Sequence, residues 1–107
     1  TAQKYGSAFK VWALKNPAEW DLAQADREAQ GFLIPFGRLV SEERTIVDQL
    51  PAIRRILTNE ASAWETLFVV AVKGSNTYLV EGGCPRKLFE SCRATFQDML
   101  GQLRLTG

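Results

Sequence analysis

The sequence predicts an α+β or α/β fold in which helices pack against a small mixed sheet of three or four strands. Runs of strand-forming residues alternate with runs whose apolar residues recur at helical spacing. With 107 residues, 46% of them hydrophobic and 23% charged, the chain is long enough to bury one core. We therefore expect residues 1–107 to form a single globular domain in the order strand, helix, strand, helix, strand, strand, helix.

The first three elements are predicted before residue 37. Residues 9–15 combine strand-forming composition with partial alternation, which indicates a strand. Asn16 followed by Pro17 is typical of a helix start, because asparagine caps free N–H groups and proline fits the first helical position. This helix should end at Gly31. Residues 32–36, which a proline interrupts, are typical of a short or edge strand.

A second helix is predicted over residues 41–58, with a serine as its N-cap. Its apolar residues follow the helical period: Ile46, Val47, Leu50, Ile53 and Leu57. Pro51 lies inside this pattern and should kink or split the helix. Asn59 is expected to cap a further turn that holds Trp64.

The C-terminal third predicts a hairpin and a long amphipathic helix. The hairpin has arms at about 66–73 and 77–81, and its first arm is apolar on both faces, as in a central strand covered on both sides. The helix should run from about 85 to 103. Its apolar stripe repeats at three and four residues: Phe89, Cys92, Phe96, Met99 and Leu103, widened by Leu88 and Leu100.

Composition excludes several classes of function. The chain has no histidine, which removes Ser-His and Cys-His catalysis and histidine-ligated zinc, so we expect a non-enzymatic protein without metal or cofactor. The 13 basic and 12 acidic residues are mixed, so nucleic acid is not the favoured partner and a membrane surface is not expected. No apolar run approaches the ~20 residues that span a bilayer. Two cysteines do not make a disulfide framework, so a reducing cytoplasm is the expected compartment.

The segment from Val80 to Lys87 is the first candidate site, because an apolar strand is expected to turn there into the last helix. Backbone N–H groups and positive charge at such a turn can hold a phosphate or another anion. The anion-binding candidates are Gly82, Gly83, Arg86 and Lys87. Arg54 and Arg55 add a second basic spot, so nucleic-acid or phosphate-ligand binding is one alternative function.

Cys84 would lie at the start of the last helix, where the helix dipole lowers thiol pKa values. Cys92 would lie roughly 12 Å further along the same helix, too far for a disulfide. The predicted element order is similar to that of thioredoxin-like domains, and this resemblance implies redox sensing through Cys84 as another alternative. The Cys-x-x-Cys of that family is absent from the first predicted helix.

A protein–protein interaction or regulatory domain, binding a protein partner or itself as a homodimer, is the leading prediction. The wide apolar stripe of the last helix can pack on the hairpin or on another chain. The partner-binding candidates are Phe89, Phe96, Met99, Leu103 and Trp64. Tryptophan and other aromatic residues are enriched at the energetic centres of interfaces.

Overall fold

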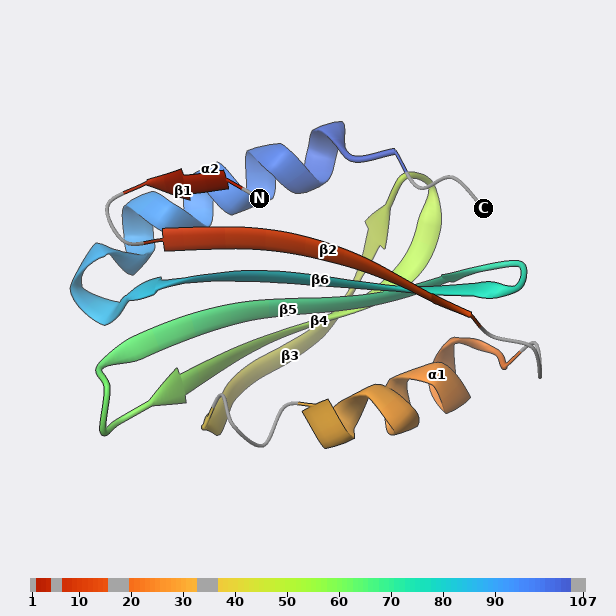
Figure 1. The fold of residues 1–107 in the computed structure, drawn as a ribbon, viewed down its shortest axis with the longest axis horizontal. Coiled ribbons are helices and arrows are strands. Elements are labelled where there is room, and N and C mark those ends of the chain that lie inside the picture. The colour runs from red at the N-terminus through yellow and green to blue at the C-terminus, as the bar shows by residue number, and fades with distance from the viewer. Residues whose placement is uncertain (1, 5–6, 16–19, 33–36, 105–107) are drawn as a thin grey trace.

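The computed structural model describes residues 2–4, 7–15, 20–32 and 37–104, which form one antiparallel sheet with a helix on each face (Figure 1). The elements in chain order are β1 (Ala2–Lys4), β2 (Ser7–Lys15), α1 (Leu22–Ala29), β3 (Arg38–Val47), β4 (Leu50–Asn59), β5 (Trp64–Lys73), β6 (Asn76–Pro85) and α2 (Phe89–Gln102). The order of strands across the sheet is β1-β2-β6-β5-β4-β3.

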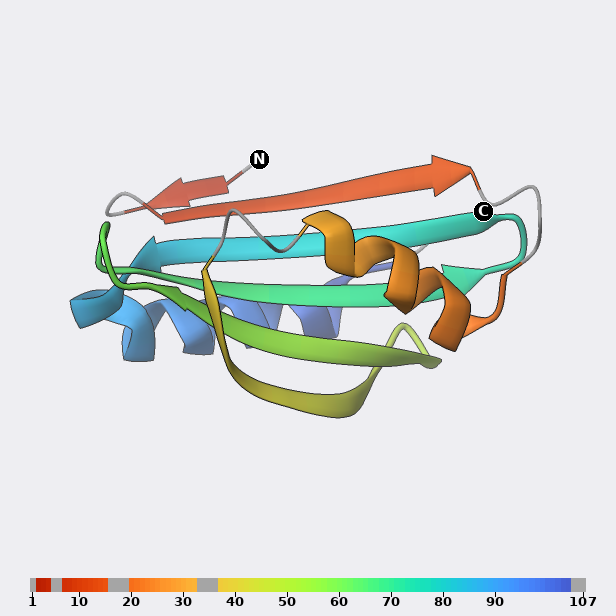
Figure 2. The same ribbon diagram turned by 90° about the horizontal axis from the view of Figure 1, so that it is seen from below.

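The two helices cover opposite faces of the sheet, as the two perpendicular views show (Figure 2). Each helix buries its apolar side on the face that it covers. On the α1 face, Ala25 and Ala29 pack on a cluster formed by Leu57, Phe68, Val70 and Leu79. On the α2 face, the helix contributes Cys92, Phe96 and Leu100. The strand residues beneath α2 are Phe9, Val47, Ala52, Ile56, Leu67, Val69, Ala71, Tyr78, Val80 and Cys84. Burying each of the larger side chains contributes about 1.5–3 kcal/mol, so the sheet is held from both sides.

The hairpin predicted near the C-terminus is confirmed, with longer arms than expected. β5 pairs with β6 from Trp64 opposite Pro85 to Lys73 opposite Asn76. The turn between them uses Gly74 at φ +60°, a conformation that favours glycine. β5 lies between β4 and β6, and its alternating residues enter both apolar clusters. The prediction of a central strand covered on both faces is therefore confirmed, and so is the strand predicted over residues 9–15.

The predicted fold class is wrong in its sheet and in its element order. All five strand pairings are antiparallel within the described residues, and they join six strands rather than the three or four of a small mixed sheet. The observed order is strand, strand, helix, four strands, helix. A thioredoxin-like topology is excluded by the same pairings.

The largest error is the helix predicted over residues 41–58, which is the hairpin of β3 and β4. The strands pair from Arg38 opposite Thr58 to Val47 opposite Leu50. Asp48 and Gln49 form the two-residue loop with φ of +49° and +65°. Positive φ at both loop residues matches the turn that best fits the twist of paired strands.

The apolar spacing in residues 41–58 resembles that of a helix because β4 is buried on both faces. Ile53 and Leu57 face α1, whereas Ala52 and Ile56 face α2, so apolar residues occur without the alternation of a half-buried strand. Pro51 precedes the first residue of β4 that pairs with β5, so its missing N–H removes no bond on that side.

The helix α1, on one face of the sheet, has its N-cap at Asp21. Asp21 caps α1 by accepting a hydrogen bond from the Gln24 N–H at 2.9 Å, and α1 is followed by a 3-10 turn, Gln30–Phe32. The predicted start at Asn16 and Pro17, and the predicted short strand except for its first residue, lie outside the described residues.

The last helix begins at Phe89 rather than at residue 85, because β6 continues through Pro85 into a 3-10 turn, Arg86–Leu88. Gly82 lies within β6, and a Cβ there would come within 2.8 Å of the Phe96 ring. Glycine at position 82 therefore allows α2 to pack closely on the sheet.

None of the described helices is long and apolar enough to cross a membrane.

Candidate functional site

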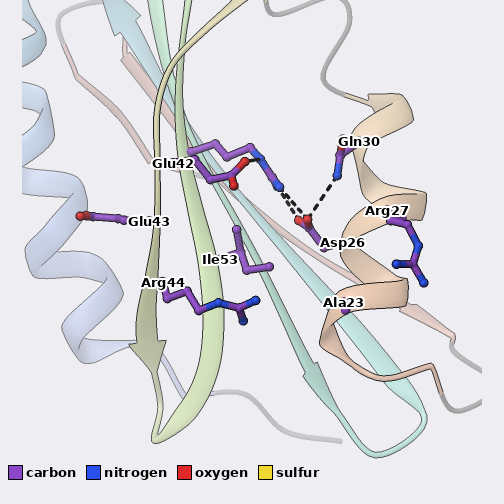
Figure 3. A pocket seen from close by; sticks show the side chains of 9 residues that line it. Ala23, Asp26, Arg27, Gln30, Glu42, Glu43, Arg44 and Ile53 are labelled. Atoms are coloured by element: carbon purple, nitrogen blue, oxygen red, sulfur yellow. Dashed lines mark hydrogen bonds and ion pairs between the residues drawn. The ribbon is translucent and has the colours of Figure 1, made fainter.

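A polar cleft of about 520 Å³ lies between α1 and the β3–β4 hairpin, and it will be called the α1 cleft (Figure 3). Its residues are Ala23, Asp26, Arg27, Gln30, Glu42, Glu43, Arg44, Ile53 and Arg55. Asp26 comes from α1, Arg55 from β4 and Glu42 from β3, so the charges in the cleft connect three elements.

A buried ion pair forms the centre of the α1 cleft. The Arg55 guanidinium donates to both carboxylate oxygens of Asp26, to Oδ2 at 2.6 Å, and its Nε donates to Glu42 at 2.8 Å. The Arg55 and Asp26 side chains are only 6% and 7% exposed. The hydrogen bond with Asp26 is the main cause that raises the pKa of Arg55. Both carboxylates thus bind Arg55, and the pair with Asp26 joins α1 to the sheet.

The other charged residues of the α1 cleft have different surroundings. Figure 3 shows Glu43 pointing away from the cleft, toward the face that carries α2. Arg27 forms no ion pair with any acid among the described residues, and it donates a hydrogen bond to the Gln24 side chain at 2.5 Å. Arg44 is exposed, and it forms no ion pair with any described residue. Arg44 is therefore an available cation on β3.

A second cleft, of about 580 Å³, lies on the opposite face beside the N-terminal end of α2, and it will be called the α2 cleft. It is lined by Val40, Ser41, Glu43, Arg54, Ile56, Glu65, Arg86, Phe89, Glu90 and Arg93. Arg54 pairs with Glu43, and its pKa is lowered by burial and by the nearby positive charge of Arg93. Within the described part of the chain, Arg93 has no ion pair of its own.

Arg86 also lines the α2 cleft, and its charge is already compensated. Its Nε donates to Glu65 at 3.0 Å, while Nη2 donates to Thr58 at 2.7 Å and to Glu60 at 3.1 Å. The hydrogen bond with Glu65 is the main cause that raises the pKa of Arg86. Lys87 is exposed and does not line the cleft.

The four residues of the predicted anion-binding turn therefore do not gather around one point: the two glycines belong to β6, and the two cations belong to the 3-10 turn that follows. Gly82 pairs with Phe9 and Leu67, and Gly83 pairs with neighbours on β2 and β5, so their backbone lies within the sheet rather than in a loop. A Cβ on Gly83 would approach the Trp64 indole nitrogen to 2.5 Å. The glycines serve packing, and the phosphate-cradling geometry assumed from the sequence is absent. Arg54 and Arg55, predicted as a second basic spot, face opposite sides of the sheet. Only Arg54 lines the same cleft as Arg86.

Cys84 lies near the end of β6, not at a helix N-terminus, and it is fully buried. Burial is the main cause that raises the pKa of its thiol to about 12, followed by a hydrogen bond with Cys92. The two side chains therefore lie close together, because α2 folds back over the strand that carries Cys84. The predicted distance between the two cysteines was wrong, since the prediction placed both of them on one helix. A protonated thiol does not act as the reactive thiolate expected there.

Four of the five predicted partner-binding residues pack against the α2 face of the sheet. Phe96 is 2% exposed, and its ring centroid lies 5.9 Å from that of Phe9. Phe89, Met99 and Leu103 are partly buried against the same cluster. The apolar stripe of α2 is therefore buried against the sheet of the same chain. Trp64 packs over Gly83 and does not join that stripe.

Sequence reasoning missed the outer margin of the sheet at β3. β3 pairs with β4 on one side, and no described strand pairs with its other side. All of its side chains from residue 38 to 44 are exposed, and so is Ile46. Three large apolar side chains are among them: Leu39 at 48%, Val40 at 52% and Ile46 at 71% exposed. The run Thr45-Ile46-Val47 was the available strand signal, because β-branched residues favour strands.

Among the described residues, no group of three or more Cys, Asp or Glu side chains lies close enough to hold a metal ion. No model of a known protein family matches the chain, and comparison with curated protein sequences finds no match.

Proposed function

We propose that this protein is a non-enzymatic protein–protein interaction domain that binds an extended segment of its partner along β3. The observation that supports this most strongly is the long, exposed outer margin formed by this ten-residue strand, which carries three exposed apolar side chains around a charged centre. An unpaired strand offers a row of N–H and C=O groups that can form main-chain hydrogen bonds with another strand.

The two sides of β3 can add specificity to this main-chain pairing. Glu42 and Arg44 project on the side of the α1 cleft, while Ser41 and Glu43 project on the side of the α2 cleft. A strand added to β3 would place alternating side chains along both clefts, because successive residues point to opposite faces. Charged side chains flanking the pairing then select among partners.

The test uses short extended peptides selected for binding to the isotope-labelled protein, followed by mapping of the backbone amides that shift. We expect the amides of β3 to shift, and we expect Ile46→Lys to weaken binding, because an exposed lysine on an edge strand opposes pairing. Val11→Lys is the matched control, since Val11 is an exposed apolar residue on β2. Binders that shift only amides outside β3, or that bind Ile46→Lys as well as wild type, would contradict the proposal.

We propose anion binding in the α2 cleft as a second candidate function, supported by the half-buried Arg93, which has no ion pair within the described ranges of the chain. Arg54, Arg86 and Arg93 enter this cleft from three elements, alongside the apolar Ile56 and Phe89. Glu43, Glu65 and Glu90 balance these charges, which favours a small phosphate or carboxylate over a nucleic acid.

Titration with inorganic phosphate at low and moderate salt tests this second function. We expect weaker binding at higher salt and its loss in Arg93→Ala, while Lys87→Ala, on an exposed residue outside the cleft, should bind as wild type. Equal affinities for all three proteins would exclude the cleft as the site.

A further inference from the structure

We infer that the segment paired with β3 is β3 of a second copy of this chain, running antiparallel about a two-fold axis at Glu43. This inference rests on the proposed function, because it names the partner that occupies the same margin. The pairing would join two sheets into one continuous sheet. A two-fold interface uses the same surface on both copies, so neither β3 strand of the dimer is left with an unpaired edge.

Strand geometry restricts the registers in which β3 can pair with its own copy. Along an antiparallel pair, residues whose N–H and C=O groups point toward the partner alternate with residues whose groups point away. Two opposite residues must therefore both be odd-numbered or both be even-numbered in this symmetric pair. The symmetric choices nearest the middle of the strand place Glu42, Glu43 or Arg44 opposite itself.

Charge selects one of these registers. With Glu43 on the axis, Glu42 of each copy lies opposite Arg44 of the other copy, so two ion pairs form on the α1 side. Each of the three registers places one charged residue opposite its own copy, Glu42, Glu43 or Arg44, but neither neighbouring register adds an ion pair. Opposite charges directly across a strand pair stabilise it, and like charges destabilise it.

The residues that flank these charges fit the same register. It places Ser41 of one copy opposite Thr45 of the other, both on the α2 side of the sheet. Ile46, 71% exposed in the single chain, follows Thr45 on the α1 side, at the end of the paired segment. The bulge between Leu39 and Ser41 ends the regular strand, so the regular pairing is confined to the segment centred on Glu43.

The three charged residues at the centre of β3, Glu42, Glu43 and Arg44, can make the contacts that this register requires. Arg44 is exposed and has no ion pair among the described residues, so it can bind Glu42 of the second copy. The Glu42 side chain is 51% exposed and binds Arg55 through Oε1. Glu43 pairs with Arg54, which compensates the two carboxylates that meet at the axis.

The other margin of the sheet does not have these properties. β1 pairs only with residues 7–9 of β2, and beyond them β2 exposes Val11, Trp12 and Leu14. The charged residues of that part of β2 are Lys10 and Lys15, with no acid among them. Two copies paired there would gain no ion pair, so charge complementarity favours β3.

The test exchanges charges between two variants. Arg44→Glu gives each copy two acids at positions 42 and 44, and Glu42→Arg gives two cations there. We expect each variant alone to dissociate, with the dimer dissociation constant raised at least tenfold, because both ion pairs become like-charge pairs. An equimolar mixture should form a one-to-one heterodimer, because both ion pairs are then restored. Sedimentation velocity measures all three samples.

Lys15→Glu, a charge reversal on β2, is the control and should dimerise as wild type. Because Glu42→Arg loses the ion pair with Arg55, its thermal unfolding is measured. Ile46→Lys keeps the test valid if Glu42→Arg does not fold, because it changes only an exposed residue of the same strand. It should raise the dimer dissociation constant on its own, since a lysine on an edge strand opposes pairing.

A monomeric wild type, unchanged dimerisation of Arg44→Glu, or folded variants that fail to associate on mixing would overturn the second-copy inference. If peptides still bound at β3 in that case, the proposed interaction function would stand with a different partner. If peptides also failed to bind at β3, both would be wrong.

Discussion

Replacing Asp26 with alanine should remove the ion pair that joins α1 to the sheet and should destabilise the fold. Asp26 accepts two hydrogen bonds from Arg55, and both side chains are at least nine-tenths buried. The variant leaves a buried guanidinium with only the half-exposed Glu42 as its acid. Removing one partner of a buried ion pair costs about 3–5 kcal/mol. We expect a loss of that size in the free energy of unfolding.

Urea denaturation followed by circular dichroism measures this loss, with an unchanged slope indicating an unchanged folded state. Glu28→Ala is the matched control, because Glu28 is an exposed acid on the same helix and should change stability by less than about 0.5 kcal/mol. Adding Arg55→Met to Asp26→Ala should recover part of the loss, since no buried charge then remains unpaired. A loss below about 1 kcal/mol for Asp26→Ala would refute the structural role of this pair.

Three further predictions follow from single positions. Gly82→Ala should cost about 1–3 kcal/mol in urea denaturation, because its Cβ would press on Phe96, whereas Gly101→Ala, in open space on α2, should not destabilise. A destabilising Gly101→Ala would contradict that contrast. Gln49→Gly should raise the free energy of unfolding by about 1 kcal/mol, because φ is +65° there, and a loss would argue against this turn. The pKa of about 12 for Cys84 exceeds its ordinary 9.0, so the folded state holds the proton more tightly. Stability should therefore fall as pH rises from about 9 toward 12, and this fall should be smaller in Cys84→Ala. Identical pH profiles would contradict the raised pKa.

The C-terminal half of the fold could be predicted because its signals are local. The β5–β6 hairpin combines two strand-forming runs with Gly74 in the turn, and the apolar stripe of α2 is long enough to show its period. The β3–β4 hairpin lacks such signals. Its loop, Asp48 and Gln49, contains no glycine, and the burial of β4 on both faces hides the alternation of a strand.

The surfaces were harder to predict than the fold, because they depend on which strands become neighbours. Arg54 and Arg55 are adjacent in sequence, yet in a strand they face opposite sides and join different clefts. Cys84 and Cys92 meet only because α2 returns over β6. The open margin at β3 could not be seen while residues 41–58 were interpreted as a helix, since only a strand has unpaired edge groups.

Disulfide crosslinking between two copies tests the pairing of β3 most directly. A cysteine placed on the two-fold axis, Glu43→Cys, would lie opposite its own copy, with Cβ atoms about 4.5–5.5 Å apart. Thr45→Cys on the same side of β3 would be separated from its copy by roughly 13 Å along the strand. With a mild oxidant, we expect rapid crosslinking of Glu43→Cys and little of Thr45→Cys, observed as non-reduced dimer on a denaturing gel. Equal rates for the two variants, or faster crosslinking of Thr45→Cys, would contradict the antiparallel pairing of β3 about Glu43.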